Sequence, residues 1–234
     1  MNPSLKIAVI SDIHSNLDAF EAIIADLPKV ESILCLGDMV GYGPQPNEVV
    51  ARIRQLRPDV VLAGNHDHAV STGITAGFSF YAAVAAKWTR KQLTRDNLQY
   101  LSALTPSSHL VQSGVRISLF HGSPRDPLNE YVYPEVPRSE VDTLIEQSNG
   151  KLLLLGHTHM PMVCSSTTGI LANPGSVGQP RDGIPKASYA IVTVSDTQVL
   201  VGIRRVVYDI DSVAKKIIDA GLPTFLADRL YVGE

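Results

Sequence analysis

Residues 5–16 read LKIAVISDIHSN, and the fold follows from this stretch. Its first six residues, five of them apolar, predict a short buried strand. The polar residues that follow place Asp12 and His14 two positions apart, so both side chains of an extended segment can point to one side. Residues 17–27 then carry apolar side chains at helical spacing, up to a proline that ends the run. The stretch therefore predicts a strand, a polar loop and a helix in succession.

The same succession recurs further along the chain. A second strand is predicted over 32–36, and it is followed by a Gly/Pro loop that contains Asp38 and by a helix over 47–56. A third strand, over 60–63, leads directly into the polar segment 64–67. Repetition of this unit favours a parallel α/β sheet. Ligands gather at the C-terminal ends of the strands in such sheets, and all three polar loops fall at that edge.

The rest of the chain mixes helices and strands. Residues 80–104 predict one long helix, or two helices with a break near Thr94. The later strands indicate antiparallel hairpins at the edge of a second sheet, with a helix and a tail after them. The predicted elements are strands over 115–120, 152–155, 163–164, 170–172, 189–194 and 199–206, and helices over 138–148 and 212–220.

The composition fits one domain over residues 1–234. Hydrophobic residues make up 44% of the chain and the net charge is -3 at pH 7. A mildly acidic balance argues against a nucleic-acid polymer as ligand. No apolar run approaches the ~20 residues that span a bilayer, and no secretion signal precedes the first strand. Two cysteines imply no disulfide framework, so we expect a cytoplasmic protein without a membrane partner.

Histidines recur where the predicted strands end. Five of the seven histidines follow an apolar strand within a few residues and stand near Gly, Asp or Asn. A lone histidine is usually structural, whereas five in equivalent settings indicate a shared function. Four of them, with two aspartates and an asparagine, make seven candidate metal ligands: Asp12, His14, Asp38, Asn65, His121, His157 and His159.

The number and type of these ligands indicate two metal ions. A single catalytic metal usually takes about three protein ligands, whereas two ions ~3.5–4 Å apart that share one carboxylate account for seven. Mixed nitrogen and oxygen ligands suit transition metals better than calcium or magnesium; manganese is favoured, with iron, nickel and zinc as alternatives. A pair of ions activates a bridging water and holds both oxygens of an in-line phosphoryl displacement.

The order and spacing of the motifs resemble the calcineurin-like metallophosphoesterase superfamily. The motifs are Asp12-x-His14, Gly37-Asp38, Gly64-Asn65-His66-Asp67, His121 and Gly156-His157-x-His159, and the likeness spans residues 7 to about 183. The resemblance implies an α/β fold, a four-layer α/β/β/α sandwich with two mixed sheets and a dinuclear metal site at the C-terminal edge of the strands. Within the superfamily, the short chain and the phrase GDMVGYG at 37–43 resemble small prokaryotic phosphodiesterases.

The resemblance also implies a role for each position of the motifs. The residues of the first metal would be Asp12, His14 and His159. The residues of the second would be Asn65, His121 and His157. Asp38 would bridge the two ions. His66 would bind no metal; it would act as general acid at the leaving-group oxygen or stabilise charge on the phosphoryl group.

Two positions depart from the Ser/Thr protein phosphatases of this superfamily. Those enzymes have an aspartate and then an arginine in the loop after the bridging carboxylate, where this chain has Gly41 and Tyr42. The difference argues against a protein phosphatase. It also leaves the orienting partner of His66 unassigned, with Asp67 as a candidate.

Two further residues are candidate substrate contacts. Asn16 lies next to the first motif, although a cap on the helix that starts at the following residue is the favoured alternative. Arg181 lies in a turn-rich segment, 173–183, that the resemblance brings back to the site, where a guanidinium could hold a substrate phosphate.

The expected function is a metal-dependent phosphoesterase that hydrolyses a phosphodiester with a hydroxide activated by two metals. His66 and Asp38 are the expected catalytic residues, and the expected partner is a small phosphate-ester substrate. The preference for a diester rests on the resemblance alone, so a phosphomonoesterase or nucleotide hydrolase on the same site is the alternative. A catalytically silent protein-binding scaffold is disfavoured because His66 and the ligand set are complete. The sequence indicates no oligomeric state.

Overall fold

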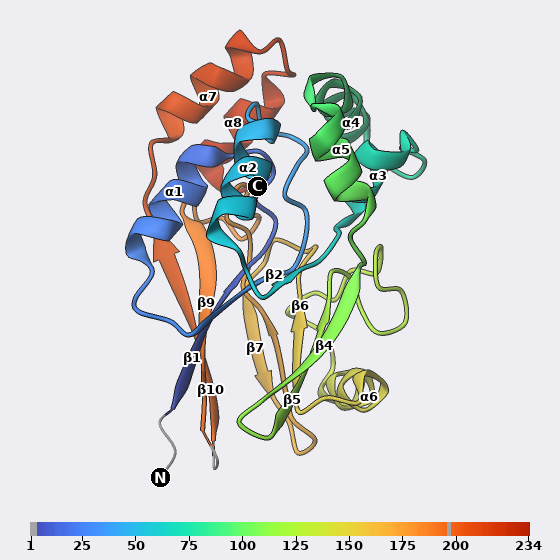
Figure 1. Cartoon of the computed structure of the whole chain (residues 1–234), viewed down its shortest axis with the longest axis vertical. Helices are drawn as coiled ribbons and strands as arrows, with labels where there is room; N and C mark the ends of the chain where they lie inside the picture. The colour runs from blue at the N-terminus through green and yellow to red at the C-terminus, as the bar shows by residue number, and fades with distance from the viewer. Residues whose placement is uncertain (1–3, 196–197) are drawn as a thin grey trace.

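The computed structural model describes residues 4–195 and 198–234 and contains two five-stranded sheets (Figure 1). The strand order of the first sheet is β10 (Val199–Val206), β9 (Ala187–Val194), β1 (Leu5–Ile10), β2 (Ser32–Cys35) and β3 (Val60–Val61). The order of the second is β4 (Ser107–Gln112), β5 (Val115–Phe120), β6 (Leu152–Leu155), β8 (Ile170–Asn173) and β7 (Met162–Ser165). Both sheets contain parallel and antiparallel pairs.

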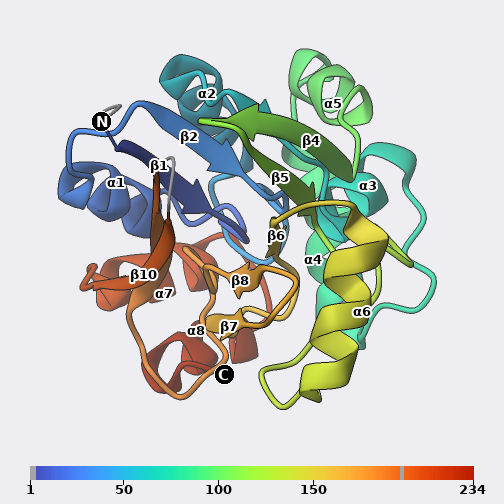
Figure 2. The same cartoon turned by 90° about the horizontal axis from the view of Figure 1, so that it is seen from below.

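Helices cover the outer faces of the two sheets. In the view from below, α1 (Leu17–Asp26) and α6 (Arg138–Ser148) lie on opposite sides of the sheets (Figure 2). The remaining helices share the hydrophobic cluster of α1, on the side of the first sheet. They are α2 (Pro46–Leu56), α3 (Asn65–Thr72), α4 (Phe80–Gln92), α5 (Arg95–Ser102), α7 (Ile210–Asp219) and α8 (Phe225–Val232).

Three hydrophobic clusters separate the four layers. Successive side chains of a strand face opposite sides. Val9 therefore packs between the sheets, whereas the next residue, Ile10, packs under α1. In β6, Leu154 faces the first sheet and Leu155 faces α6. Strands buried on both faces read as continuous apolar runs, which is why they are recognisable in the sequence. The expected four-layer α/β/β/α sandwich is confirmed.

The parallel strands place the polar loops at one edge. β1, β2 and β3 run parallel in the first sheet, and β5, β6 and β8 run parallel in the second. The residues that follow β1, β2, β5 and β6 consequently emerge together where the two sheets meet. This convergence is the positional basis of the site described below.

Some elements differ from the sequence prediction. Helix α3 begins within the Gly64-Asn65-His66-Asp67 motif, and α8 lies in the segment expected to be a tail. Strand β4 pairs with β5 and was not expected. The segment 80–104 forms two helices. The two C-terminal hairpins do not share a sheet: β7 and β8 join the second, whereas β9 pairs with β1 and extends the first.

Two expectations about the whole chain concern cysteines and membranes. Cys35 is buried, and neither cysteine forms a disulfide. Among the helices of residues 4–195 and 198–234, none is both long enough and apolar enough to cross a lipid bilayer.

Candidate metal centre

Backbone hydrogen bonds join the loops that carry the predicted ligands. The amide of Asp12 donates to the carbonyl of Gly37 at 3.0 Å, and the amide of His14 donates to that of Asp38 at 3.0 Å. The amide of Gly178 donates a hydrogen bond to the carbonyl of Asp12 at 3.0 Å. Three stretches of chain far apart in sequence are therefore locked together around the first motif.

The predicted ligands gather in two buried clusters. The ligand atoms of each cluster lie within 4.8 Å of one another. One cluster contains Asp12, His14, Asp38 and His159, and the other contains Asp38, His121 and His157. Asn65 joins the second cluster, because its Oδ1 lies 3.2 Å from Nε2 of His121. The structure thus brings all seven predicted ligands together; their binding of metal stays a prediction.

Asp38 stands between the two clusters. Its Oδ2 lies 3.5 Å from Nε2 of His14 and 3.5 Å from Nε2 of His121. Its other oxygen, Oδ1, accepts a hydrogen bond from the amide of His66 at 2.8 Å. One oxygen is therefore fixed by the backbone while the other faces both groups of imidazoles, which is the position of a shared ligand.

Backbone carbonyls orient the histidine rings. Nδ1 of His14 lies 3.1 Å from the carbonyl oxygen of Val40. Nδ1 of His121 lies 2.8 Å from that of Leu36, and Nδ1 of His159 lies 2.6 Å from that of Gln179. A carbonyl oxygen can only accept, so each Nδ1 carries a proton and each Nε2 faces the cluster. His157 is reversed, since its Nε2 contacts the carbonyl of Asn129 at 3.1 Å. Such hydrogen bonds characterise metal-ligating histidines.

Two carboxylate oxygens have no hydrogen-bond donor within the described residues. They are Oδ1 of Asp12 and Oδ2 of Asp38, and both are buried. A buried carboxylate oxygen without a partner is costly unless a cation compensates it. The orphaned oxygens and the imidazole lone pairs face the same space, and this donor set of nitrogen and oxygen fits divalent transition metals.

The electrostatics favour neutral imidazoles at most of these positions. Burial holds the pKa of His14 and of His159 well below the usual histidine value, and burial lowers the pKa of His157 to about 4. His121 differs: burial lowers its pKa, but the charge of Asp38, whose Oδ2 lies 3.5 Å away, raises the value to about 9. A neutral imidazole is the form that binds metal.

The backbone at the ligands is strained. Non-glycine residues rarely adopt a positive φ, and each such residue costs about 1–3 kcal/mol. Glycines pack closely against this strained backbone. A Cβ at Gly64 would overlap the Asp38 carboxylate, and one at Gly156 would overlap Ser11. The ligands with positive φ are Asp12 (56°), His14 (49°), Asp38 (51°), His157 (69°) and His159 (61°).

Asp67 holds the loop after β2 against the start of α3. Its Oδ1 accepts from the amide of Val40 at 3.1 Å, and its Oδ2 accepts from those of Met39 at 3.2 Å and Gly64 at 3.0 Å. Burial and the charge of Asp38 raise its pKa to about 7. Because both oxygens are occupied by amides, Asp67 is not the orienting partner proposed for His66; the sequence does not indicate these amide contacts, which join separate loops.

His66 faces a pocket beside the clusters. The ring is buried, and burial lowers its pKa to about 4. Its centroid lies 4.4 Å from that of Tyr42 and 4.6 Å from that of Phe78, and its Nδ1 has no hydrogen-bond partner in the described part of the chain. A Cβ at Gly41 would overlap this ring, so the departure at Gly41 makes room for His66.

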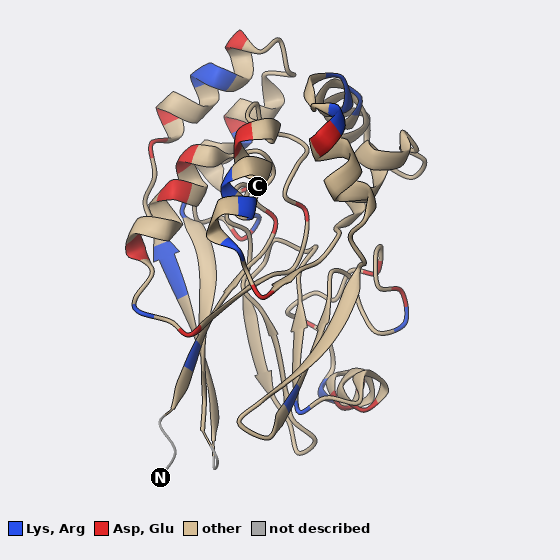
Figure 3. Ribbon diagram, viewed as in Figure 1, with Lys and Arg blue, Asp and Glu red and all other residues tan. Residues whose placement is uncertain are grey.

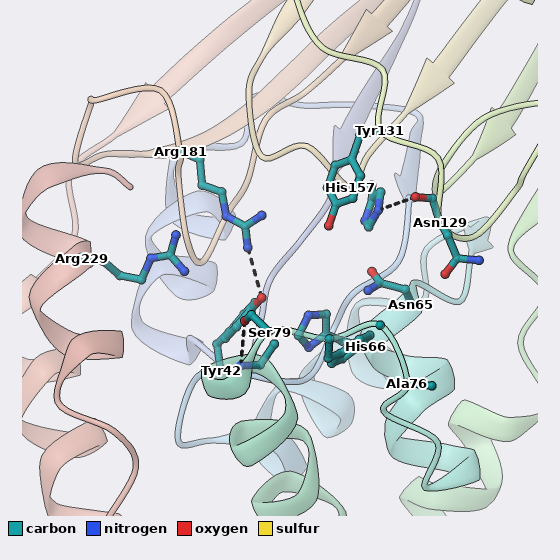
Figure 4. Close-up of a pocket in the computed structure, with 13 residues that line it drawn as sticks. Tyr42, Asn65, His66, Ala76, Ser79, Asn129, Tyr131, His157, Arg181 and Arg229 are labelled. Carbon is teal, nitrogen blue, oxygen red and sulfur yellow. Dashed lines mark hydrogen bonds between the residues drawn. The ribbon is translucent and has the colours of Figure 1, made fainter.

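The pocket has a volume of about 660 Å³ and combines expected and unexpected residues (Figure 4). Tyr131 comes from the proline-rich loop after β5 and stacks on His157 with centroids 3.8 Å apart. Arg181 donates from Nη2 to the hydroxyl of Tyr42 at 3.2 Å. Arg229, from α8, was not expected, because no motif marks it in the sequence.

Asn16 serves the protein's own backbone. Its Oδ1 accepts from the amide of Ala19 at 3.0 Å and caps α1, while its Nδ2 donates to the carbonyl of Gly178 at 3.0 Å. The capping alternative is thus observed. A contact between Asn16 and substrate stays a prediction, and it would require one of these hydrogen bonds to be shared.

Comparison with known families identifies the superfamily. Residues 5–197 match the model of the calcineurin-like phosphoesterase superfamily domain. The chain belongs to this superfamily. Calcineurin-like phosphoesterases are hydrolases of phosphoesters, and the buried His/Asp clusters agree with the divalent metal binding that the superfamily suggests.

Individual proteins resemble most or nearly all of the chain. Uncharacterized protein MJ0912 of Methanocaldococcus jannaschii is 39% identical over 246 residues, which cover 97% of this chain and 98% of that protein. The crystal structure of a metallophosphoesterase from Sphaerobacter thermophilus has a TM-score of 0.84 and 36% identity, and the match covers 99% of this chain and 100% of that one. Phosphodiesterase YfcE of Escherichia coli is 25% identical, over 80% of this chain and 87% of that protein.

Replacing Asp38 tests its position between the clusters. We expect Asp38→Asn to reduce bound metal below two ions per chain and to abolish turnover, because the amide removes the negative charge that both groups of imidazoles face. Metal content is measured by elemental analysis. Asp96→Asn, at a side chain that is 84% exposed, is the matched control. Two bound metals with normal turnover in Asp38→Asn would contradict the assignment.

Replacing Asp67 tests its role in holding the loops. Asp67→Ala removes the acceptor of three buried amides, and each amide left without an acceptor costs about 1–3 kcal/mol. We therefore expect a lower free energy of unfolding in urea denaturation and weaker binding of Mn²⁺ in titrations. His68→Ala, on an exposed neighbour in the same helix, is the control. Equal stability of the two variants would show that the amides find other partners.

Proposed function

We propose that this protein is a phosphodiesterase that works with two divalent metal ions. The observation that supports this most directly is the single oxygen of Asp38 that lies equally far from a histidine of each cluster. Asp12, His14 and His159 would hold the first ion, and His121, His157 and Asn65 would hold the second. Manganese suits this mixed nitrogen and oxygen set, with iron, nickel and zinc as alternatives. The ions would supply Lewis acidity that activates water for in-line attack on phosphorus.

The protein's own groups would orient the reaction. Asn65 and His157 belong to the second cluster and also line the pocket. A phosphate bound at the second cluster would therefore face the pocket. His66 lies beside them, and its neutral ring would donate an N–H to the phosphoryl or leaving-group oxygen. The buried hydrogen bonds that the imidazole N–H groups donate to backbone carbonyls keep the rings from turning, which preserves this geometry between turnovers.

A small diester suits the pocket better than a polymer. The volume of about 660 Å³ falls in the range of small-molecule sites. In the part of the chain that the structure describes, Lys and Arg are interspersed with Asp and Glu and form no continuous stripe in the view of Figure 3. The relative named phosphodiesterase YfcE supports the diester as the substrate class.

A phosphomonoesterase is the second candidate. A monoester carries more negative charge than a diester, and two arginines, Arg181 and Arg229, line the pocket. Guanidinium groups bind phosphate oxygens strongly. The same two metals and His66 would serve either substrate, so the choice between them depends on the kinetic preference.

The first test of the proposal combines metal analysis with two chromogenic substrates. We expect near two metals per chain, and faster hydrolysis of bis(4-nitrophenyl) phosphate than of 4-nitrophenyl phosphate, increased by added Mn²⁺. A preference for 4-nitrophenyl phosphate would favour the monoesterase. Absence of bound metal and of turnover, even after Mn²⁺ is added, would contradict a metal-dependent esterase of either kind.

Replacing His66 separates catalysis from metal binding. We expect His66→Ala to keep its metals and to lower kcat ~10²–10⁴-fold, the usual effect of losing a group that donates to the reacting oxygens. Elemental analysis and steady-state kinetics measure the two quantities. His68→Ala, two positions further along α3 and exposed, should retain both. A His66→Ala protein that loses metal would identify His66 as a ligand.

A further inference from the structure

Two arginines from distant parts of the chain line the pocket on the side away from His157. Arg181 follows β8, and Arg229 lies on α8 near the end of the chain. In the close-up, Arg181 stands above Tyr42, with Arg229 beyond it and with Asn65 and His157 on the other side of the pocket (Figure 4). Each guanidinium belongs to an element with its own anchoring.

Helix α8 is fixed against the loop that carries Arg181. The amide of Gly183 donates to the carbonyl of Gly233 at 2.9 Å. Gly233 has a φ of 68°, and a Cβ there would lie 2.6 Å from the nitrogen of Ile184, so the helix end and the loop are in close contact. Leu226 and Leu230 bury the other face of α8 in the first hydrophobic cluster. The two arginines are therefore held together by the fold.

Within the described part of the chain, neither arginine forms an ion pair with an acidic side chain. Among residues 4–195 and 198–234, no ion pair includes Arg181 or Arg229. The adjacent carboxylate, Asp182, is paired with Arg205 instead. Burial and the charge of Arg181 lower the pKa of Arg229 to about 10, which leaves it protonated at neutral pH. The charge of Glu234 acts in the opposite direction and raises the pKa of Arg229, so this arginine is partly compensated. Two cations in one pocket nevertheless attract an anion.

The donors of both guanidinium groups are only partly used. Nη2 of Arg181 donates to uncharged oxygens, the hydroxyl of Tyr42 and Oε1 of Gln179 at 3.1 Å. Its Nε is buried and has no partner among residues 4–195 and 198–234. Nε of Arg229 donates to the main-chain oxygen of Glu234, and the group lies 5.3 Å from the ring of Phe225. The remaining N–H groups are free to hold the oxygens of a phosphate or carboxylate.

Tyr42 separates this pair from the metal clusters. Its ring centroid lies 4.4 Å from that of His66 and 5.8 Å from Cζ of Arg181. An anion between the arginines and a phosphate beside His66 would consequently occupy two ends of one pocket, with the ring of Tyr42 between them. One small organic molecule that carries both groups would therefore fit this pocket.

We propose that Arg181 and Arg229 bind a second anionic group of the substrate, a phosphate or carboxylate separate from the scissile phosphodiester. The inference rests on the proposed function and narrows its substrate class to diesters with a distal anion. Arg229 is the residue whose replacement tests the second anion site, because the charge of Arg181 also lowers the pKa of His66 and of His159.

Matched substrates with one leaving group test the proposal. Thymidine 5′-(4-nitrophenyl phosphate) is compared with the same compound carrying a 3′-phosphate, and both release 4-nitrophenolate. We expect kcat/KM to be about 10-fold or more higher for the 3′-phosphorylated compound, the scale of hydrogen bonds to charged groups. In Arg229→Gln the ratio of the two values should fall to near one. Arg229→Lys, which keeps the charge, should retain part of it.

A surface arginine provides the control. Arg204→Gln, on the exposed part of β10, should keep the wild-type ratio. An unchanged ratio in Arg229→Gln, or a wild-type ratio near one, would overturn the proposal. The ratio is unaffected by a uniform loss of active protein, so a partly unstable variant still gives a valid result.

A binding measurement separates this inference from the proposed function. Calorimetry of the Mn²⁺-loaded protein with thymidine 3′,5′-bisphosphate and thymidine 5′-monophosphate needs no turnover. Tighter binding of the bisphosphate by wild type, lost in Arg229→Gln, would support the arginine pair even if no diester were hydrolysed. Turnover of bis(4-nitrophenyl) phosphate with equal binding of the two nucleotides would support the esterase and refute the second anion site.

Discussion

The burial of Asp12 and Asp38 is the constraint around which the molecule is built. Both side chains are almost fully inaccessible, at 0% and 1% exposure, and each has one oxygen without a donor. Burying carboxylates in this way is costly unless positive charge compensates them. The amides of His66 and His157 donate to these two carboxylates, and the glycines packed against them leave the space that they occupy. The two sheets meet there because each supplies part of the cluster.

The sequence predicts the grouping of the candidate ligands more completely than it predicts the helices and strands around them. Pairs such as Asp12 and His14 are local, and a buried strand followed by such a pair is visible in a single stretch. Helix α3 was missed because its first turn consists of the polar residues of the site, which conceal an amphipathic pattern. The sheet that β9 joins could not be predicted, because it depends on pairing with β1 across nearly the whole chain.

The least predictable residues are those that work through distant backbone. Asp67 could be recognised as a carboxylate in a motif, but its acceptance of amides from Met39 and Val40 depends on how two loops meet. Arg229 belongs to an eight-residue helix in a segment that resembles a tail. The superfamily model ends at residue 197, so this wall of the pocket lies outside the matched part. Metal ligands and the far wall of the pocket are thus encoded in different regions of the chain.

The closure of Gly178 on Asp12 has a consequence for how the protein is made. The ligands extend from residue 12 to residue 159, and the segment that seals the first cluster follows them all. A nascent chain still on the ribosome that has exposed only its first strands holds single motifs, each too small to retain an ion. Metal binding at the predicted ligands would therefore follow the docking of the two sheets. The ion would then be selected by an already folded scaffold from the metals that its surroundings supply.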